Sequence, residues 1–493
     1  MQGVQVISRM ASGTARLVLA KGLSICLGFA TGPIIARLFS AEDMGSAGII
    51  YAASAWIAVV GCLSYDQAIP LSVDAGEMRA IIRLCLVLAA IVFLATVLGS
   101  MGAKGLGTLL GWGDVRRLVW FVPPTVLATC LVSIGYFAAS RGGRYSLVSI
   151  SGFVGANLTR ILLIGMGLLF GSSAVAVLLA GVLGTASEVL ITGLVFIPLV
   201  LAGADTRSHS VPLRVVAVRY RQFPAMQLWN NVLDASARSL PVFLLGGLFG
   251  AQVVGFYVFG YRLLSLPISL LGQSLAQVFY PEASAEWNRT GAVTHTAFSS
   301  ISILSILFVF PTLMLILLAP LMFTFLFGEN WYEAGVYAQI LAPVIGVQLV
   351  VSPISSIFLI RRRAGLLFRY TVALLVGQSC GLLLGAWLGG ARIGLALLSV
   401  CSSATYCHML VSALKLGEVP WGPILASMTK QALVSLAVLL PASIAYWVLD
   451  LRELTLVAFA SGALLYAFSL YHTEARIRRI VRQPFARIWA QTI

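Results

Sequence analysis

Four cationic side chains lie within strongly apolar stretches of this sequence: Lys21, Arg160, Arg238 and Arg262. Only 10% of the residues are charged, whereas 59% are hydrophobic. A Lys or Arg at the centre of a membrane helix costs roughly 2.5–3.5 kcal/mol, so four facing lipid would cost on the order of 10–14 kcal/mol. We therefore expect these side chains to face protein or a water-filled cavity, where cations suit an anionic cargo.

Polar side chains accompany the cations at helical spacing, so that each set shares one face of a helix. Between residues 226 and 249 the set is Gln227, Asn230, Asn231, Asp234 and Arg238. Between residues 251 and 279 it is Arg262, Ser265, Ser269, Gln273 and Gln277. The first apolar stretch carries Lys21, Ser24, Gly28 and Thr31, and Asn157 shares a face with Arg160. These stripes favour the walls of a wet cavity.

Some of these charges have other interpretations. Asp234 and Arg238 are i,i+4 partners and could form a neutralised structural ion pair. Lys21 lies near the end of its stretch and could extend its ammonium group to the membrane surface. Asp66, Glu188 and Asp234 could each balance an arginine or carry a coupling proton or Na⁺. The sequence leaves these roles open.

No metal or organic cofactor is expected. The seven cysteines lie in or at the ends of apolar stretches without a Cys-x-x-Cys pair, and the four histidines are scattered without metal-ligand spacing. Small apolar packing residues are the favoured interpretation of the cysteines. Coupling to a proton or Na⁺ gradient, through the carboxylates named above, is left open.

Apolar stretches long enough to cross a bilayer recur along nearly the whole chain, whose mean hydropathy is +0.97. They predict an all-α polytopic membrane protein with about 14 transmembrane helices. We expect two pseudo-symmetric six-helix bundles around a central cavity, followed by two C-terminal helices. The predicted boundaries are 1–204 for the first bundle, 205–222 for a basic cytoplasmic linker, 223–414 for the second bundle and 415–493 for the extra helices and basic tail.

The distribution of loop cations predicts orientation. With the N-terminus in the cytoplasm, Arg residues concentrate on the inside loops, including the triplet Arg361–Arg363 and the tail after residue 475. The positive-inside rule then places both termini in the cytoplasm. The same rule, together with anionic lipid, accounts for the net charge of +15, so we expect no nucleic-acid partner. Within the linker, Val211–Tyr220 could form a short basic surface helix or remain a solvated connector.

An internal repeat supports the division into two halves. Its first copy contains Phe39, Ala41, Gly45 and Tyr51, and its second contains Phe249, Ala251, Gly255 and Tyr261 at the same spacing. Each copy corresponds to the turn between the first two helices of a half. The first and seventh helices are then equivalent, which predicts that Lys21, Arg238 and Arg262 surround one central cavity.

Three segments resemble polysaccharide repeat-unit flippases of the Wzx type, which belong to the MOP exporter superfamily: Leu19–Gly45, Arg219–Pro224 and Val254–Glu282. The similarity is best over the first twelve helices. It implies two six-helix bundles, alternating access and no enzymatic activity. It also implies a cargo of undecaprenyl-pyrophosphate-linked oligosaccharide, exported from the cytoplasmic side of a bacterial inner membrane for O-antigen, lipopolysaccharide or exopolysaccharide synthesis.

The resemblance also suggests roles for the residues identified above. Lys21, Arg160, Arg238 and Arg262 would bind the pyrophosphate or an acidic sugar, and Asn230, Asn231, Gln273 and Gln277 would bond sugar hydroxyls. The lipid bilayer and other polysaccharide-assembly membrane proteins are candidate partners. The alternatives are a drug or small-molecule exporter like the MATE transporters and a glycan polymerase or ligase. MATE exporters commonly carry a carboxylate in the first helix, where this chain has Lys21, and the short outside loops disfavour the enzyme.

Overall fold

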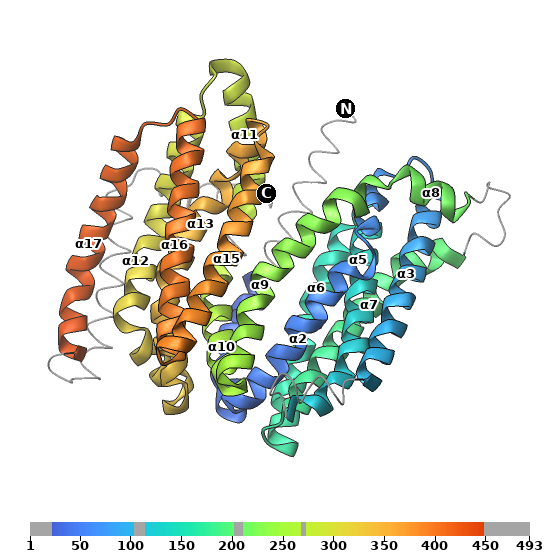
Figure 1. Cartoon of the computed structure of the whole chain (residues 1–493), viewed down its shortest axis with the longest axis horizontal. Helices are drawn as coiled ribbons and strands as arrows, with labels where there is room; N and C mark the ends of the chain where they lie inside the picture. Colours follow the sequence, from blue (N-terminus) through green and yellow to red (C-terminus); the bar gives the residue numbers. More distant parts are fainter. Residues whose placement is uncertain (1–21, 103–113, 202–210, 268–272, 448–493) are drawn as a thin grey trace, which may run out of the picture. The chain divides into compact units, whose positions relative to one another are not determined.

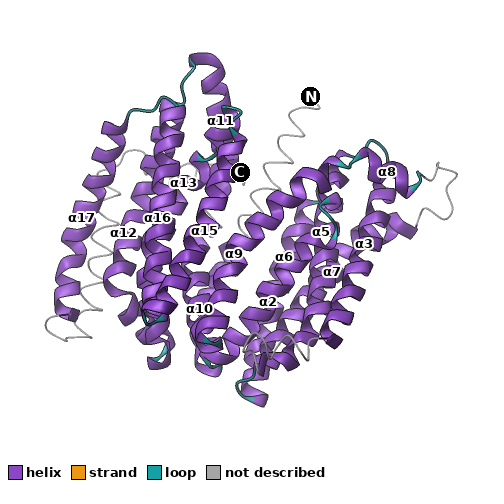
Figure 2. Ribbon diagram, in the orientation of Figure 1, coloured by secondary structure: helices purple, strands orange, loops and turns teal. Residues whose placement is uncertain are grey.

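Figure 1 shows the structure, a computed structural model that describes residues 22–102, 114–201, 211–267 and 273–447. Within these ranges the regular elements are helices and no strand occurs (Figure 2). Eleven of the described helices are long and apolar enough to cross a membrane. The predicted all-α membrane fold is therefore confirmed, whereas the count of 14 is not.

Three of the predicted spans are described only in part or not at all. The predicted span 251–279 is helical at residues 251–267 and from residue 273 onward, and residues 268–272 between these parts lie outside the described residues. The last predicted span, near 454–471, lies outside the described residues. The first predicted span is described from residue 22 onward, as the apolar helix Gly22–Leu38.

The helices follow one another in the order α2 (Ala41–Gly61), η1 (Tyr65–Leu71), α3 (Ala75–Gly102), η2 (Asp114–Phe121), α5 (Val122–Arg141), α6 (Tyr145–Phe170), α7 (Ala174–Leu201), α8 (Leu213–Arg219), η4 (Phe223–Gln227), α9 (Leu228–Phe249) and α10 (Ala251–Pro267). They continue with α11 (Gln273–Thr290), α12 (Thr294–Phe327), η6 (Glu329–Trp331), α13 (Tyr332–Ile354), α14 (Ser356–Ile360), α15 (Ala364–Leu388), α16 (Ala391–Leu416) and α17 (Trp421–Trp447).

The chain divides into two compact units. The first unit contains Met1–Leu266, Thr324–Tyr337 and Phe368–Ser402, and the second contains the remaining segments. In the second unit, Phe310 of α12 and Leu439 of α17 form a buried apolar cluster. The guanidinium of Arg361 there lies 4.0 Å from the ring centroid of Trp287. The predicted boundaries at residues 204, 222 and 414 stay predictions.

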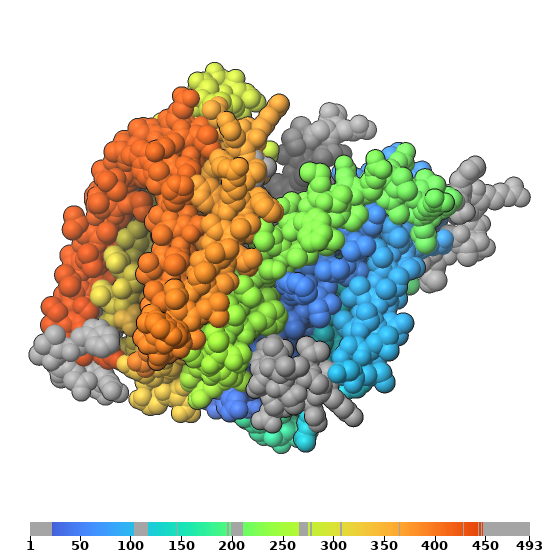
Figure 3. Space-filling model, viewed as in Figure 1, coloured from blue at the N-terminus to red at the C-terminus, as the bar shows by residue number. Residues whose placement is uncertain are grey.

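Small residues allow the helices of the first unit to pack closely. A Cβ atom on Gly61 of α2 would overlap the sulfur of Cys130 on α5, and one on Gly184 of α7 would overlap the hydroxyl of Thr159 on α6. Such small-residue contacts are typical of helix packing in membranes, where lipid supplies no hydrophobic drive between helices. Helix α9 runs across α2, as the space-filling view shows (Figure 3).

Residues 213–219 of the predicted linker form the helix α8, which packs on α3. Of the two alternatives predicted for this segment, the solvated connector is therefore wrong for these residues. Val216 is fully buried there. The hydroxyl of Tyr65 donates to the carbonyl of Ala217 at 3.1 Å. Arg219 Nη1 lies 2.5 Å from Oε1 of Glu77, whose side chain is only 3% exposed. The basic segment is therefore attached to the end of the first helical bundle.

The two copies of the predicted repeat contact each other reciprocally. A Cβ atom on Gly45 would overlap the carbonyl oxygen of Ala251, and one on Gly255 would overlap that of Ala41. Gly48 faces Val258, its own counterpart, with 3.3 Å between a Cβ on Gly48 and Val258 Cγ2. Reciprocal contacts of this kind are the mark of a two-fold relation between the paired segments. The repeat in the sequence is thus a geometrical repeat between α2 and α10.

Candidate functional site

A cavity of about 360 Å³ lies among the Gly22–Leu38 helix, α2, α6, α7 and α10 of the first unit. We call it the arginine pocket because two of the predicted cations, Arg160 and Arg262, line it. Its polar lining also includes Thr31, Tyr51, Thr159 and Thr185. None of the described residues that line it is an Asp or Glu.

Arg160 is held at a defined position in this pocket. Its Nη1 donates to Oδ1 of Asn157 at 2.7 Å and to the hydroxyl of Ser24 at 3.0 Å. A Cβ atom on Gly28 would lie 3.1 Å from its Nη2. The guanidinium therefore lies against the Gly22–Leu38 helix at Gly28, where that helix has no side chain. The predicted pairing of Asn157 with Arg160 on one face is a direct contact.

Arg262 reaches the same pocket from α10. Among the described residues, its side chain has neither an acidic partner nor a hydrogen-bond acceptor. The hydroxyl of Tyr51 is fixed by donation to the carbonyl of Val177 at 2.8 Å, and Gly181 leaves room for it. Two guanidinium groups without a neutralising carboxylate make this pocket complementary to an anion.

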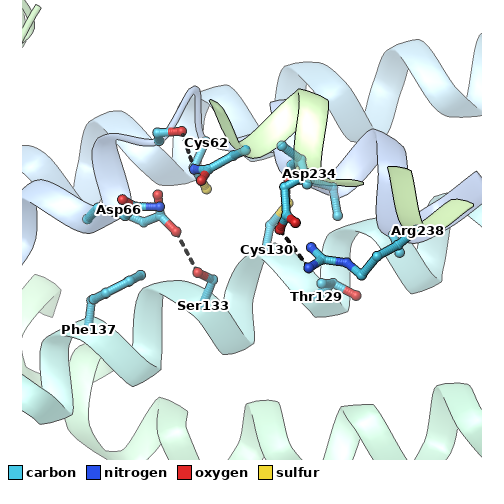
Figure 4. Close-up of a pocket in the computed structure, with 14 residues that line it drawn as sticks. Cys62, Asp66, Thr129, Cys130, Ser133, Phe137, Asp234 and Arg238 are labelled. Carbon is cyan, nitrogen blue, oxygen red and sulfur yellow. Dashed lines mark hydrogen bonds and ion pairs between the residues drawn. The ribbon is translucent and has the colours of Figure 1, made fainter. Parts of the chain in front are cut away.

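A second cavity of about 360 Å³ lies among α2, η1, α5 and α9 of the same unit (Figure 4). We call it the aspartate pocket because Asp66 and Asp234 both line it. Asp66 is buried and accepts a hydrogen bond from the hydroxyl of Ser133 at 2.5 Å. Burial raises the pKa of Asp66 above its ordinary value, while the hydrogen bond from Ser133 opposes that shift.

The interpretation of Asp234 and Arg238 as an ion pair is confirmed, since Nη1 of Arg238 lies 2.6 Å from Oδ2 of Asp234. Figure 4 shows this pair facing Thr129 and Cys130 across the aspartate pocket. Both side chains are more than half exposed, at 65% and 58%, so the pair is accessible from the pocket. Arg238 is thus neutralised locally, unlike Arg262.

The remaining predicted site residues are distributed as follows. Asn231 lines the aspartate pocket and donates to the hydroxyl of Ser64 at 3.1 Å, whereas Asn230 is exposed and lines neither pocket. Glu188 of α7 packs against Gly155 of α6 and also lines neither pocket. Lys21 and the side chains of Gln273 and Gln277 lie outside the described residues.

Two of the predicted cations line different pockets: Arg238 the aspartate pocket and Arg262 the arginine pocket. That both surround one central cavity with Lys21 stays a prediction, since Lys21 lies outside the described residues. Arg262 instead shares its pocket with Arg160. The prediction missed Tyr51 and Ser133, although Tyr51 belongs to the repeat and Ser133 follows Thr129 at an i,i+4 spacing within an apolar stretch. That spacing is the signal that could have indicated the wall of the aspartate pocket.

The fold is that of MOP-superfamily transporters. It is similar to a structure described as "Lipid II flippase MurJ, inward closed conformation", with a TM-score of 0.71 at 12% sequence identity over 92% of this chain and 98% of that chain. It is also similar to an inward-facing multidrug resistance MATE family transporter of the MOP superfamily, with a TM-score of 0.63 at 14% identity over 82% of this chain and 94% of that chain. At these identities the similarity concerns the fold.

The sequence defines the family within this fold. Residues 34–336 match the family described as "Polysaccharide biosynthesis protein", and the chain belongs to that family. A segment of 160 residues is 27% identical to the teichuronic acid biosynthesis protein TuaB of Bacillus subtilis (strain 168). That match covers 32% of this chain and 33% of TuaB. The expectation of a non-enzymatic membrane protein agrees with the flippase and the transporter that share the fold.

Proposed function

We propose that this protein is a flippase that moves an undecaprenyl-pyrophosphate-linked oligosaccharide across a bacterial inner membrane. The observation that carries the proposal is the arginine pocket, where two guanidinium groups face a cavity lined by no described carboxylate. A MOP transporter fold and membership of a polysaccharide biosynthesis family support it. A cationic drug would be repelled by this pocket, which disfavours the MATE-like alternative.

In the proposed mechanism, Arg160 and Arg262 bind the pyrophosphate or an acidic sugar. Guanidinium groups suit this role because their N–H groups match phosphate and carboxylate oxygens in pairs. Threonine hydroxyls and Tyr51 around the same cavity supply further polar contacts. The polyprenyl tail remains in lipid while the head group passes between the helices. Release on the far side requires a second conformation in which the anion binds more weakly.

The aspartate pocket is the candidate for energy coupling. With both termini in the cytoplasm, as the loop cations predict, η1 and Asp66 lie toward the cytoplasmic side. A carboxyl group whose pKa is raised by burial binds a proton more readily than an exposed one. Asp66 is therefore the favoured proton carrier among the three predicted carboxylates, since Asp234 is paired with Arg238 and Glu188 lines neither pocket. Asn230, Asn231, Gln273 and Gln277 keep their proposed role toward sugar hydroxyls.

The decisive experiment is a deletion of the gene, with lipid-linked intermediates identified by mass spectrometry and assigned to a membrane face by their accessibility to a non-permeant glycosidase. The proposal expects undecaprenyl-linked oligosaccharide on the cytoplasmic face and loss of surface polymer. Normal glycan together with altered drug tolerance would instead indicate a small-molecule exporter.

Point variants then test the pocket. Arg160→Ala and Arg262→Ala should each fail to complement the deletion at normal protein level. Arg117→Ala is the matched control, because Arg117 of η2 is exposed and lines neither pocket. Full complementation by both pocket variants would refute the assignment of the anion site.

A further inference from the structure

The repeat pairs Arg238 of α9 with Gly28, the residue beside which the guanidinium of Arg160 lies. The second copy lies 210 positions after the first, as Phe249 does after Phe39. Continued toward the N-terminus along two uninterrupted helices, the same offset pairs Gly28 with Arg238. It also pairs Ser24 with Asp234.

The contacts of these helices support that continuation. Helix α9 packs on α2, with Trp56 Nε1 donating to the hydroxyl of Ser236 at 2.8 Å. The equivalent pair, the Gly22–Leu38 helix and α10, lies together around the arginine pocket. There Gly28 and Gly32 line the cavity with Phe259 of α10.

In both copies a guanidinium lies beside the paired residues. In the second copy, Arg238 pairs with Asp234 one turn earlier on its own helix. In the first copy, position 28 is glycine, and the guanidinium of Arg160 arrives from α6 to lie over it and to donate to Ser24. Each pair of residues therefore contacts one guanidinium, which comes from α9 itself in the second copy and from α6 in the first.

The residue that accepts the hydrogen bond from the guanidinium differs between the copies. This difference decides whether the positive charge of the arginine is neutralised. Asp234 neutralises Arg238, whereas Ser24 accepts a hydrogen bond from Arg160 without cancelling its charge. The guanidinium has five N–H groups, of which two are on Nη1. Asn157 and Ser24 accept from Nη1, and no described residue accepts from the three N–H groups on Nε and Nη2.

We propose that Gly28, Ser24 and Asn157 are positioning residues that form a seat for one guanidinium, and that this seated charge binds the anionic group of the cargo. Gly28 admits the guanidinium, Ser24 and Asn157 orient it through Nη1, and the N–H groups on Nε and Nη2, which have no acceptor among the described residues, remain for a phosphate-type oxygen. The requirement is a guanidinium at this place, whichever helix supplies it. This inference rests on the proposed function, because it assigns the anion to the arginine pocket.

The test moves the arginine to the helix that carries it in the second copy. Binding of inorganic pyrophosphate to the purified full-length protein is measured by titration calorimetry, and complementation of the deletion is measured alongside. Arg160→Ala should weaken pyrophosphate binding by about tenfold or more, which is the scale of one charge-assisted contact. Gly28→Arg alone should also weaken it, because two guanidinium groups would compete for one seat. The double variant Gly28→Arg/Arg160→Ala should recover binding to within about threefold of the parent, which is well inside the tenfold scale of the lost contact.

A second pair of variants covers the case in which the arginine at position 28 prevents folding. Gly28→Val should displace Arg160 and weaken pyrophosphate binding. Gly22→Val is its matched control on the same helix, since a Cβ there would meet no atom within 4 Å. Asn157→Leu should weaken binding in the same direction as Gly28→Val, with protein level and melting temperature close to those of the parent.

The outcomes separate the two proposals. A double variant as weak as Arg160→Ala, or equal binding by Gly28→Val and Gly22→Val, overturns the seat while the anion site stands. Parent-like pyrophosphate binding and complementation by Arg160→Ala also overturn the seat, and the same result for Arg262→Ala as well overturns the anion site itself. Recovery by the double variant, or selective loss in Gly28→Val, supports the seat.

Discussion

Gly45 and Gly255 occupy reciprocal positions between α2 and α10: each is pressed against the backbone of the other copy, at Ala251 and Ala41 respectively. Neither position has space for a methyl group, because the obstructing atoms belong to the backbone and cannot rotate away. The close approach of the two repeats therefore depends on a missing side chain in each.

Gly45→Ala and Gly255→Ala should each lower stability by about 1–3 kcal/mol, the usual cost of overpacking a close contact. The measurement is the melting temperature of the purified protein in detergent. Gly247→Ala is the matched control, because a Cβ at Gly247 of α9 would meet no atom within 4 Å. Equal melting temperatures for all three variants would contradict the assigned contact.

Trp331 should connect η6 to the first helix through both packing and a hydrogen bond. It is 1% exposed, and its Nε1 donates to the carbonyl of Ala36 at 2.7 Å. Its ring meets Phe256 edge to face at 6.1 Å between centroids. Trp331→Ala should cost about 3–5 kcal/mol through the cavity it leaves. Trp331→Phe keeps most of the packing and should cost about 1–3 kcal/mol, since the Ala36 carbonyl loses its side-chain donor. Chemical denaturation, followed by the fluorescence of the remaining tryptophans, measures the unfolding free energy of both variants. If Trp331→Phe is as unstable as Trp331→Ala, the stabilisation comes from the hydrogen bond and not from packing.

The attachment of α8 should depend on Glu77. Its carboxylate accepts from the backbone N–H of Val73 at 2.7 Å and pairs with Arg219. Glu77→Ala should therefore release α8 and speed tryptic cleavage after Arg214 and Arg219. Glu42→Ala is a suitable control, since Glu42 also lies in a first helical turn but far along the chain at the start of α2. Unchanged cleavage in Glu77→Ala would show that Val216 and Tyr65 hold α8 without the ion pair.

The stability contributed by Asp66 should fall as pH rises. Burial raises its folded-state pKa, so the folded protein binds the Asp66 proton more tightly than the unfolded chain does. The stabilising proton is fully present below the ordinary Asp pKa, about 3.9, and is lost as pH rises through the raised folded value. Asp66→Asn keeps an oxygen that accepts from Ser133 and removes the charge. It should melt at or above the parent temperature at pH 8, and the difference should shrink as the pH falls. A melting difference independent of pH would contradict a titrating Asp66.

Much of the fold was predictable because membrane helices are determined locally. Long apolar stretches must satisfy their backbone hydrogen bonds internally, and they do so as helices wherever they occur. The repeat was likewise visible in a few spaced residues, Phe39 to Tyr51 and their counterparts.

The candidate site was predictable by residue type but not by grouping. The apolar surroundings of Arg160, Arg238 and Arg262 were enough to identify them as unusual, and their helical spacing identified Asn157 and Asp234 as neighbours. Spacing along one helix reports only contacts within that helix. It cannot report which other helix lies across from it.

The sequence by itself therefore determined the helices, the polar faces and the ion pair of Asp234 with Arg238, all of which follow from interactions within a few residues. Only the tertiary structure decided that Arg160 reaches Ser24 over Gly28, a contact between residues 136 positions apart. It also decided that Arg262 joins Arg160 while Arg238 lines another pocket. The physical reason is that a guanidinium lies where one helix has no side chain and where acceptors are within hydrogen-bond distance. Only the packing of different helices brings such a glycine and such acceptors together.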